Sequence, residues 1–317
     1  MGSLPLMGWR FCPALLALGV LYGQVTVETR ARASAPPSLM PPASLRIDSN
    51  LVLVPVTVCD NHNRPVTGLE KQHFRVFDDS VEQTVTHFGM EDAPVSVGLV
   101  FDISGSMSSK LRLAREAVSE FMSTSNPEDD FFLVEFNERP KLVTPLTEDY
   151  REIESQLAFA DAHGRTALLD AIVLAMHEMK RSHKSRKALL IVSDGGDNCS
   201  RYTAGELKNL VRESDAIIYA TGIYGLASSP EELAGPSLLT DIAEQSGGRH
   251  FAVDLHDLPD IAAKIGIELR NRYVIGYSPT NQRRDGRYHP VQVKVVPPRG
   301  ISSLRTSWRR GYYAPSE

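Results

Sequence analysis

The sequence predicts an α/β protein, in which a doubly wound, mainly parallel sheet is joined by a second, small β-sandwich built from the flanking segments. Three observations predict this fold. Apolar runs alternate with segments of helical periodicity between residues 93 and 268, which is typical of βα units. The flanking segments, 45–92 and 269–317, contain strand-like runs and no helical pattern. The run Val97–Phe101 is continuously apolar, which indicates a strand covered on both faces.

Composition bounds the classes of protein to consider. A chain of 317 residues is long enough for two domains at about 150 residues each. Its hydrophobic and charged fractions, 42% and 23%, are those of a globular protein. The net charge of −5 and the dispersed Lys and Arg residues argue against binding of nucleic acid.

The N-terminal residues 1–23 are predicted to be a signal peptide. Arg10 precedes the apolar run 11–22, which is shorter than the ~20 residues of a spanning helix. An uncleaved anchor is the alternative. No later segment is apolar enough to span a membrane, so we expect a secreted, periplasmic or cell-surface protein. Residues 24–44 are rich in Pro and Ala, which predicts an extended linker.

The two flanking segments are predicted to share one sandwich. Val-rich or alternating runs predict strands at 51–58, 74–77, 81–88, 272–277, 291–295 and 303–313. The cluster Asp78-Asp79-Ser80 is typical of a hairpin turn. Neither segment alone is large enough for a core, but together they supply about seven strands. We therefore expect the α/β domain, residues 93–268, to be inserted into this sandwich.

Within the α/β domain the expected strands and helices alternate. Strands are expected at 97–102, 131–136, 142–146, 188–192, 216–223 and 250–253. Helices are expected at 113–122, 167–179, 204–215, 238–245 and 258–269. Short connections between such units imply a mainly parallel sheet with helices on both faces. Asp129 and Asp130 are expected in a solvated turn before their strand.

The strongest chemical signal stands where the first of these strands ends. Asp102, Ser104 and Ser106 follow the apolar run at alternate positions, with Gly105 between the two hydroxyls. The ends of parallel strands are where open α/β sheets place ligands. Oxygen atoms are the donors that a hard divalent cation prefers, and glycine permits a tight bend. The pattern predicts a metal-binding loop at the carboxyl end of a central strand.

Two further loops place similar groups. The sequence Gly164-Arg165-Thr166-Ala167 has a hydroxyl just before a helix, and Ser193-Asp194-Gly195 follows another buried strand. Taken singly, Asp102, Ser104 or Ser106 is better explained as a helix N-cap. Together with Thr166 and Asp194 they favour a metal site.

This pattern resembles the metal-ion-dependent adhesion site of the von Willebrand factor A domain. The five positions of that site are matched by Asp102, Ser104, Ser106, Thr166 and Asp194, and the order of elements agrees over roughly residues 93–268. The flanking strands and the ending Arg-Arg-Gly-Tyr-Tyr-Ala-Pro, residues 309–315, also resemble a group of exported bacterial proteins related to this domain. The resemblance implies a Rossmann-like sheet and a role in adhesion or complex assembly.

The residue types agree with that function. Asp102 and Asp194 supply two charges, and the three hydroxyls are neutral, so a divalent ion is balanced and still attracts another carboxylate. We expect Mg²⁺, with Mn²⁺ or Ca²⁺ as alternatives. The expected partner is a protein that offers an Asp or Glu to the ion, a strong contact at low dielectric. The sequence contains no signal for a particular oligomeric state.

Catalytic alternatives are weaker. A phosphatase-like hydrolase that uses Asp102 needs a second Asp two positions later, where this chain has Ser104. Neither a Gly-x-Ser-x-Gly nucleophile motif nor a His-Glu-x-x-His zinc motif occurs. We therefore expect that the protein is not an enzyme, and we retain the Mg²⁺-dependent phosphatase as the alternative. A third possibility is a metal that only supports folding.

The two cysteines outside the signal peptide, Cys59 and Cys199, lie in different predicted domains. We expect two unpaired, small apolar residues, with a disulfide between them as the alternative.

Overall fold

The computed structural model describes residues 51–90, 93–223, 230–300 and 303–316. The predicted signal peptide, 1–23, and the predicted linker, 24–44, lie outside the described residues. None of the described helices combines the length and the apolar character that crossing a membrane requires. The boundaries proposed for the α/β domain, 93 and 268, stay a prediction.

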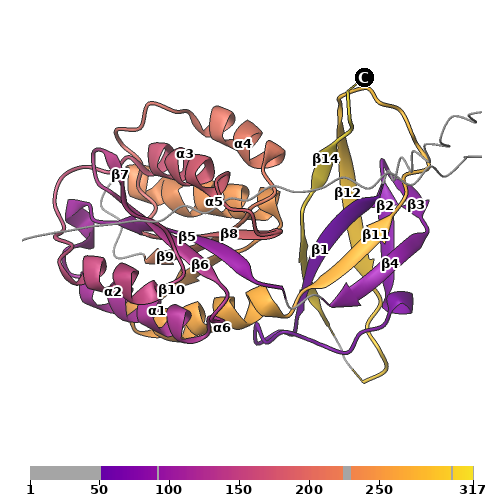
Figure 1. Ribbon diagram of the computed structural model, residues 1–317, viewed down its shortest axis with the longest axis horizontal. Coiled ribbons are helices and arrows are strands. Elements are labelled where there is room, and N and C mark those ends of the chain that lie inside the picture. The colour runs from indigo at the N-terminus through magenta and orange to yellow at the C-terminus, as the bar shows by residue number, and fades with distance from the viewer. Residues whose placement is uncertain (1–50, 91–92, 224–229, 301–302, 317) are drawn as a thin grey trace, which may run out of the picture. The chain divides into compact units, whose positions relative to one another are not determined.

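A six-stranded sheet forms the centre of the α/β part (Figure 1). Its strand order is β10-β9-β8-β5-β6-β7, and all neighbours are parallel except β7, which pairs antiparallel with β6. The strands are β5 (Val95–Asp102), β6 (Asp130–Phe136), β7 (Pro140–Thr147), β8 (Arg186–Ser193), β9 (Ile217–Ile223) and β10 (His250–Val253). All residues of β5 are buried, as the continuous apolar run predicts. The predicted mainly parallel sheet is confirmed.

Helices cover both faces of this sheet (Figure 1). They are α1 (Leu111–Ser123), α2 (Tyr150–Ala158), α3 (Leu168–Met179), α4 (Ala204–Glu213), α5 (Pro230–Ser246) and α6 (Leu258–Arg270). Leu99 and Phe101 of β5 pack in the core with α1, α2 and α6, whereas Val100 packs in the core with α3, α4 and α5. Successive side chains of a strand point to opposite faces, so β5 contributes to both cores.

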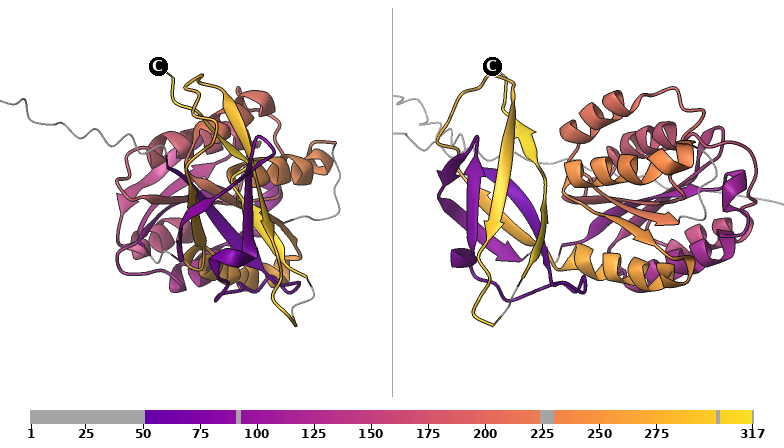
Figure 2. Two further views of the ribbon diagram at one scale, coloured as in Figure 1. Left: turned by 90° about the vertical axis from the view of Figure 1, so that its right-hand side faces the viewer. Right: turned by 180° about the vertical axis from the view of Figure 1, so that it is seen from behind.

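A β-sandwich of two four-stranded sheets accompanies the α/β part, with strand orders β13-β1-β11-β4 and β14-β12-β2-β3. The N-terminal strands are β1 (Val52–Cys59), β2 (Phe74–Asp78), β3 (Val81–Gln83) and β4 (Val85–Met90). The C-terminal strands are β11 (Tyr273–Tyr277), β12 (Tyr288–Val295), β13 (Arg305–Trp308) and β14 (Gly311–Tyr313). Figure 2 shows the indigo N-terminal strands beside the yellow C-terminal ones. Val56, Val76, Tyr273 and Val293 pack in its core, so both ends of the chain share one core.

Two of the strands expected from the sequence are each divided in two, because the chain passes from one sheet to the other within them. The expected strand 81–88 is divided into β3 and β4, and the expected strand 303–313 into β13 and β14, which belong to different sheets. Helix α2 was not expected; Asp149 begins it by accepting a hydrogen bond from the backbone N–H of Arg151. The expected hairpin turn is present, and Asp79 and Ser80 have φ values of 47° and 69°, as a two-residue type I′ turn requires.

The expectation for Asp129 and Asp130 was wrong. Asp129 is 1% exposed, and its Oδ2 lies 2.6 Å from a guanidinium nitrogen of Arg270. Asp130 is 8% exposed, and its carboxylate pairs with Lys184 at 3.1 Å. Both cations lie far away in the sequence, so no local pattern could reveal that these carboxylates are buried and paired.

Cys59 and Cys199 are both free, as predicted. Burial and the neighbouring Glu268 carboxylate raise the pKa of the Cys59 thiol to about 12. A thiol that stays protonated is a poor nucleophile and a poor metal ligand, and that of Cys59 instead donates a weak hydrogen bond to Oε2 of Glu268 at 3.7 Å.

Candidate metal centre

Asp102 is the last residue of β5 and is fully buried. Its Oδ1 accepts a hydrogen bond from the backbone N–H of Ser104 at 2.8 Å, and its Oδ2 accepts one from the Ser193 hydroxyl at 2.6 Å. Burial, and next the charge of Asp194, raise the pKa of the Asp102 carboxyl to about 6. These two hydrogen bonds fix the orientation of the carboxylate. Because burial disfavours its negative charge, a nearby cation would stabilise it.

The hydroxyls of Ser104 and Ser106 are 3.2 Å apart. Ser104 stands at the N-cap position of a short 3-10 helix, Gly105–Met107, but its side chain makes no capping hydrogen bond. The N-cap interpretation therefore does not account for this hydroxyl. Gly105, between Ser104 and Ser106, donates its N–H to the carbonyl of Gly164 at 3.0 Å. The backbone of this loop therefore lies close to the backbone of the loop that contains Gly164.

Thr166 is 5% exposed and lies in the loop before α3, whose N-cap position is Ala167. Its N–H donates to Oδ1 of Asn198 at 3.0 Å, and its carbonyl accepts from the N–H of Asn198 at 3.0 Å. Because Asn198 follows Asp194 on the next loop, these two bonds fix the Thr166 loop to the Asp194 loop.

Asp194 is 3% exposed and directly follows the last residue of β8. Its Oδ2 accepts a hydrogen bond from Nζ of Lys110, 2.9 Å away. Lys110 stands at the start of α1, after the Ser104 and Ser106 loop. No local pattern predicts this contact, because a lysine before a helix does not show which way its side chain points.

Hydrogen bonds join the three loops in pairs. The Asp102 loop is bound to the Thr166 loop through Gly105 and through the N–H of His163, which donates to the carbonyl of Ile103 at 2.9 Å. The Asp102 loop is bound to the Asp194 loop by the Ser193 hydroxyl. The Thr166 and Asp194 loops are joined by Asn198. The five predicted residues therefore stand on three mutually bonded loops, of which two follow β5 and β8 and the third precedes α3.

Two polar residues next to these loops support the backbone. Oδ1 of Asp197 accepts hydrogen bonds from the N–H of Leu169, at 3.4 Å in the first turn of α3, and from the Ser200 hydroxyl, at 2.5 Å. Asn198 binds Thr166 as described. These contacts of Asp197 and Asn198 hold the loops together.

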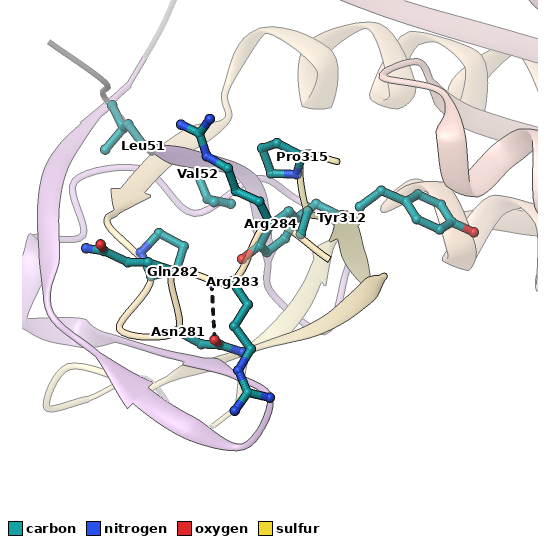
Figure 3. A pocket seen from close by; sticks show the side chains of 11 residues that line it. Leu51, Val52, Asn281, Gln282, Arg283, Arg284, Tyr312 and Pro315 are labelled. Atoms are coloured by element: carbon teal, nitrogen blue, oxygen red, sulfur yellow. Dashed lines mark hydrogen bonds between the residues drawn. The ribbon is translucent and has the colours of Figure 1, made fainter. Parts of the chain in front are cut away.

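A pocket of about 240 Å³ lies in the sandwich, away from these loops in the sequence (Figure 3). Arg283, Arg284 and Tyr312 are among its lining residues. Figure 3 shows the guanidinium groups of Arg283 and Arg284 extending in opposite directions. Because the two cations do not converge, this pocket lacks the paired arrangement that recognition of a carboxylate or phosphate uses.

Comparison with known proteins finds relatives of the α/β part. The model of a family described as von Willebrand factor type A domain matches residues 97–196. Inter alpha-trypsin inhibitor heavy chain 4 of Mus musculus is 30% identical over 146 residues, 41% of this chain and 16% of that protein. An uncharacterised protein of Borreliella burgdorferi is 27% identical over 187 residues, 51% of this chain and 54% of that protein. The chain thus spans at most about half the length of these two relatives.

A solved structure shows the same fold. It is a von Willebrand factor type A protein from Catenulispora acidiphila, with a TM-score of 0.50 and 15% sequence identity. The match covers 77% of this chain and 73% of that one. At this level of identity the likeness extends to the fold alone.

Proposed function

Because this chain carries a von Willebrand factor type A domain, we propose that it is an exported protein that binds Mg²⁺ and, through the ion, a protein ligand in adhesion or complex assembly. The proposed ligands are Asp102, Ser104, Ser106, Thr166 and Asp194. Mn²⁺ or Ca²⁺ would use the same oxygen atoms. The protein partner contributes an Asp or Glu carboxylate to the bound ion.

The observation that carries this proposal is the pair of buried carboxylates at the ends of neighbouring strands. Asp102 and Asp194 are 0% and 3% exposed, and the charge of Asp194 adds to burial in disfavouring the charged form of Asp102. Two buried negative charges are stable only near a cation. Lys110 supplies one positive charge to Asp194, whereas a divalent ion balances both carboxylates. The surrounding hydroxyls offer oxygen, the donor that Mg²⁺ prefers.

The three hydroxyl ligands are neutral, which determines how strongly a bound ion attracts a further carboxylate. Three hydroxyls add no charge, so a bound Mg²⁺ keeps its attraction for an acidic side chain. A bound Mg²⁺ would supply a positive centre that attracts a carboxylate of the partner. Asp102 and Thr166 are buried, so these loops would shield one side of the ion from water. The partner then needs only one exposed Asp or Glu in a complementary surface.

Titration calorimetry with Mg²⁺ tests the metal site. We expect one site in the wild-type protein and at least tenfold weaker binding in Asp102→Asn and Asp194→Asn. Asp241→Asn removes an exposed carboxylate that pairs with Lys208 on α4, and serves as the control. Equal Mg²⁺ binding in all four proteins would exclude the proposed site.

A second experiment separates ligand binding from a structural metal. A labelled acidic peptide should bind in Mg²⁺ and be released by EDTA, while circular dichroism shows that the fold persists. Loss of the fold in EDTA would instead favour a metal that only supports folding.

The hydrolase alternative has its own readout. The test is whether the protein hydrolyses p-nitrophenyl phosphate in Mg²⁺. Activity that is present in the wild type and absent in Asp102→Asn would favour a phosphatase over the proposed binding function. The position two residues after Asp102 is Ser104, so the second Asp of that chemistry is missing from this loop. The name of the mouse relative is that of an inhibitor chain, which favours binding over hydrolysis.

A further inference from the structure

A second group of possible metal ligands lies in the sandwich and has no part in the function proposed above. Asp78 ends β2, Asp79 follows it in the type I′ turn, and His289 stands on the neighbouring strand β12. Asp78 is 3% exposed and His289 is 4% exposed. A carboxylate and an imidazole this deeply buried require partners that offset the loss of water.

The two carboxylate oxygens of Asp78 differ in their hydrogen bonds. Oδ2 accepts hydrogen bonds from the hydroxyls of Tyr277, at 3.0 Å, and Tyr312, at 2.9 Å. Burial, and with it the charge of Asp78, raises the pKa of both tyrosines, so they remain protonated donors. Oδ1 is shielded from solvent and has no hydrogen-bond partner among the described residues. A buried carboxylate oxygen without a donor calls for a positive partner.

The atoms near this oxygen are of the types that bind metal ions. Nδ1 of His289 lies 3.9 Å from Asp78 Oδ1 and 2.7 Å from Asp79 Oδ2. One ligand atom from each of the three residues lies within 4.8 Å of the others. An ion bound at about 2.0–2.2 Å from nitrogen and oxygen ligands holds those ligands roughly 3–4 Å apart, so His289 Nδ1 and the exposed Asp79 Oδ2, 2.7 Å apart, would separate slightly to admit it. The side chain of Asp79 is 41% exposed, and this exposure provides a path for the ion and its waters.

The other nitrogen of His289 supports the same assignment. Nε2 lies 3.4 Å from Oδ1 of Asp285. Histidine ligands of metals usually donate their second N–H to a carboxylate or carbonyl, which fixes the ring and leaves the first nitrogen for the metal. The ring also stacks on Tyr312, with centroids 5.5 Å apart. His289 is therefore held with Nδ1 directed at Asp78 and Asp79.

A protonated His289 is the competing explanation, and it leaves one feature unexplained. An imidazolium can donate from Nδ1 to Asp79 and from Nε2 to Asp285. Asp78 Oδ1, 3.9 Å from Nδ1, lies beyond hydrogen-bond distance in that arrangement. A metal ion would contact Asp78, Asp79 and His289 together.

We propose that Asp78, Asp79 and His289 form a binding site for a divalent first-row transition metal such as Zn²⁺. An imidazole nitrogen with two carboxylate oxygens suits such an ion, whereas Mg²⁺ prefers oxygen alone. Asp79 and His289 are 210 residues apart in the sequence. The ion would join an N-terminal strand of the sandwich to a C-terminal one and close a long loop of chain.

Titration of the full chain with Zn²⁺ at a pH of about 8, where an imidazole sheds its proton, tests this site. We expect one Zn²⁺ site that is at least tenfold weaker in His289→Gln and in Asp79→Asn. Zn²⁺ should raise the Tm of the wild type and leave the Tm of these two variants unchanged. Asp79→Asn keeps the fold testable, because Asn accepts a positive φ and the side chain lies at the surface. Glu82→Gln on the adjacent β3 is the control, since Glu82 pairs with Arg75 instead.

The same titration with Asp102→Asn separates the two sites. We expect unchanged Zn²⁺ binding in that variant, whatever the outcome for Mg²⁺. Zn²⁺ affinity and Tm shifts that are equal in wild type, Asp79→Asn and His289→Gln would overturn the proposal and leave a buried imidazolium as the explanation. Absence of Zn²⁺ binding in the wild-type protein would overturn it as well.

Discussion

Nζ of Lys110 lies 2.9 Å from Oδ2 of Asp194, and the two side chains are 14% and 4% exposed. The candidate metal site thus carries a cation from its own chain on one of its two carboxylates. Such a pair stabilises the buried charge of Asp194 when no divalent ion is bound. The same contact places a positive charge where a divalent ion would bind, so we infer that Lys110 and the ion compete for Asp194.

Replacement of Lys110 by Met should therefore strengthen Mg²⁺ binding. Removing a competing charge is expected to raise the affinity by about tenfold, which is ~1.4 kcal/mol. The measurement is titration calorimetry on Lys110→Met, with Lys208→Met, whose partner is the exposed Asp241, as the control. An affinity that stays constant or falls would show that Lys110 does not compete with the ion.

Ser193→Ala should weaken both the fold and the metal site. The Ser193 hydroxyl donates to Asp102 and accepts from the N–H of Gly195 at 3.0 Å, so its loss leaves a buried carboxylate oxygen without its donor. We expect a loss of about 1–3 kcal/mol in the free energy of unfolding. Urea denaturation measures this, with the exposed Ser155→Ala on α2 as the comparison. Equal stability of the two variants would contradict the importance of the Asp102 contact.

Acid should destabilise the protein in part through His250. Burial lowers the pKa of this imidazole in the folded state, so the unfolded chain binds more protons. Its contribution to stability is complete above the unfolded pKa of about 6.5 and is lost as the pH falls through the lower folded pKa. We expect His250→Gln to lose less stability than wild type between about pH 7.5 and about pH 5 in urea unfolding. Equal losses in both proteins would refute this.

Gly98 in β5 should not tolerate a side chain. A Cβ at this position would lie 2.2 Å from Cζ of Phe132 on β6 and 2.6 Å from Cδ2 of Leu189 on β8. Gly98→Ala is expected to cost about 1–3 kcal/mol of unfolding free energy, because a packed core must shift. Gly89→Ala on β4 meets no atom within 4 Å and provides the matched control for urea denaturation. Similar effects of the two substitutions would argue against tight packing at Gly98.

The domain boundaries are tested by expressing residues 93–268 alone. Two buried apolar clusters, one on each face of the six-stranded sheet, lie within this segment except for Leu269, the residue just after it. We expect a soluble fragment that unfolds in one cooperative transition, because nearly all the buried residues of these two cores lie within it. Circular dichroism during heating provides the measurement, and an insoluble or gradually melting fragment would place the boundaries elsewhere.

The parts of the fold that rest on short-range patterns were predictable. The apolar run of β5, the helical spacing of α1 and α3, and the Asp79–Ser80 turn all follow from residues close together in the sequence. Helix α2 was missed, although Asp149 caps it. The division of 303–313 into β13 and β14 was missed as well, because a change of sheet depends on distant strands.

The order of strands and helices, and the oxygen-rich ends of β5 and β8, are properties of the sequence itself, since period and residue type are local quantities. Contacts between distant residues are decided only when the chain packs. The ammonium of Lys110 on Asp194, the Ser193 hydroxyl on Asp102, and the approach of His289 to Asp78 all belong to this class. They depend on side-chain directions and on burial, which arise from the whole fold and which no segment of sequence carries alone.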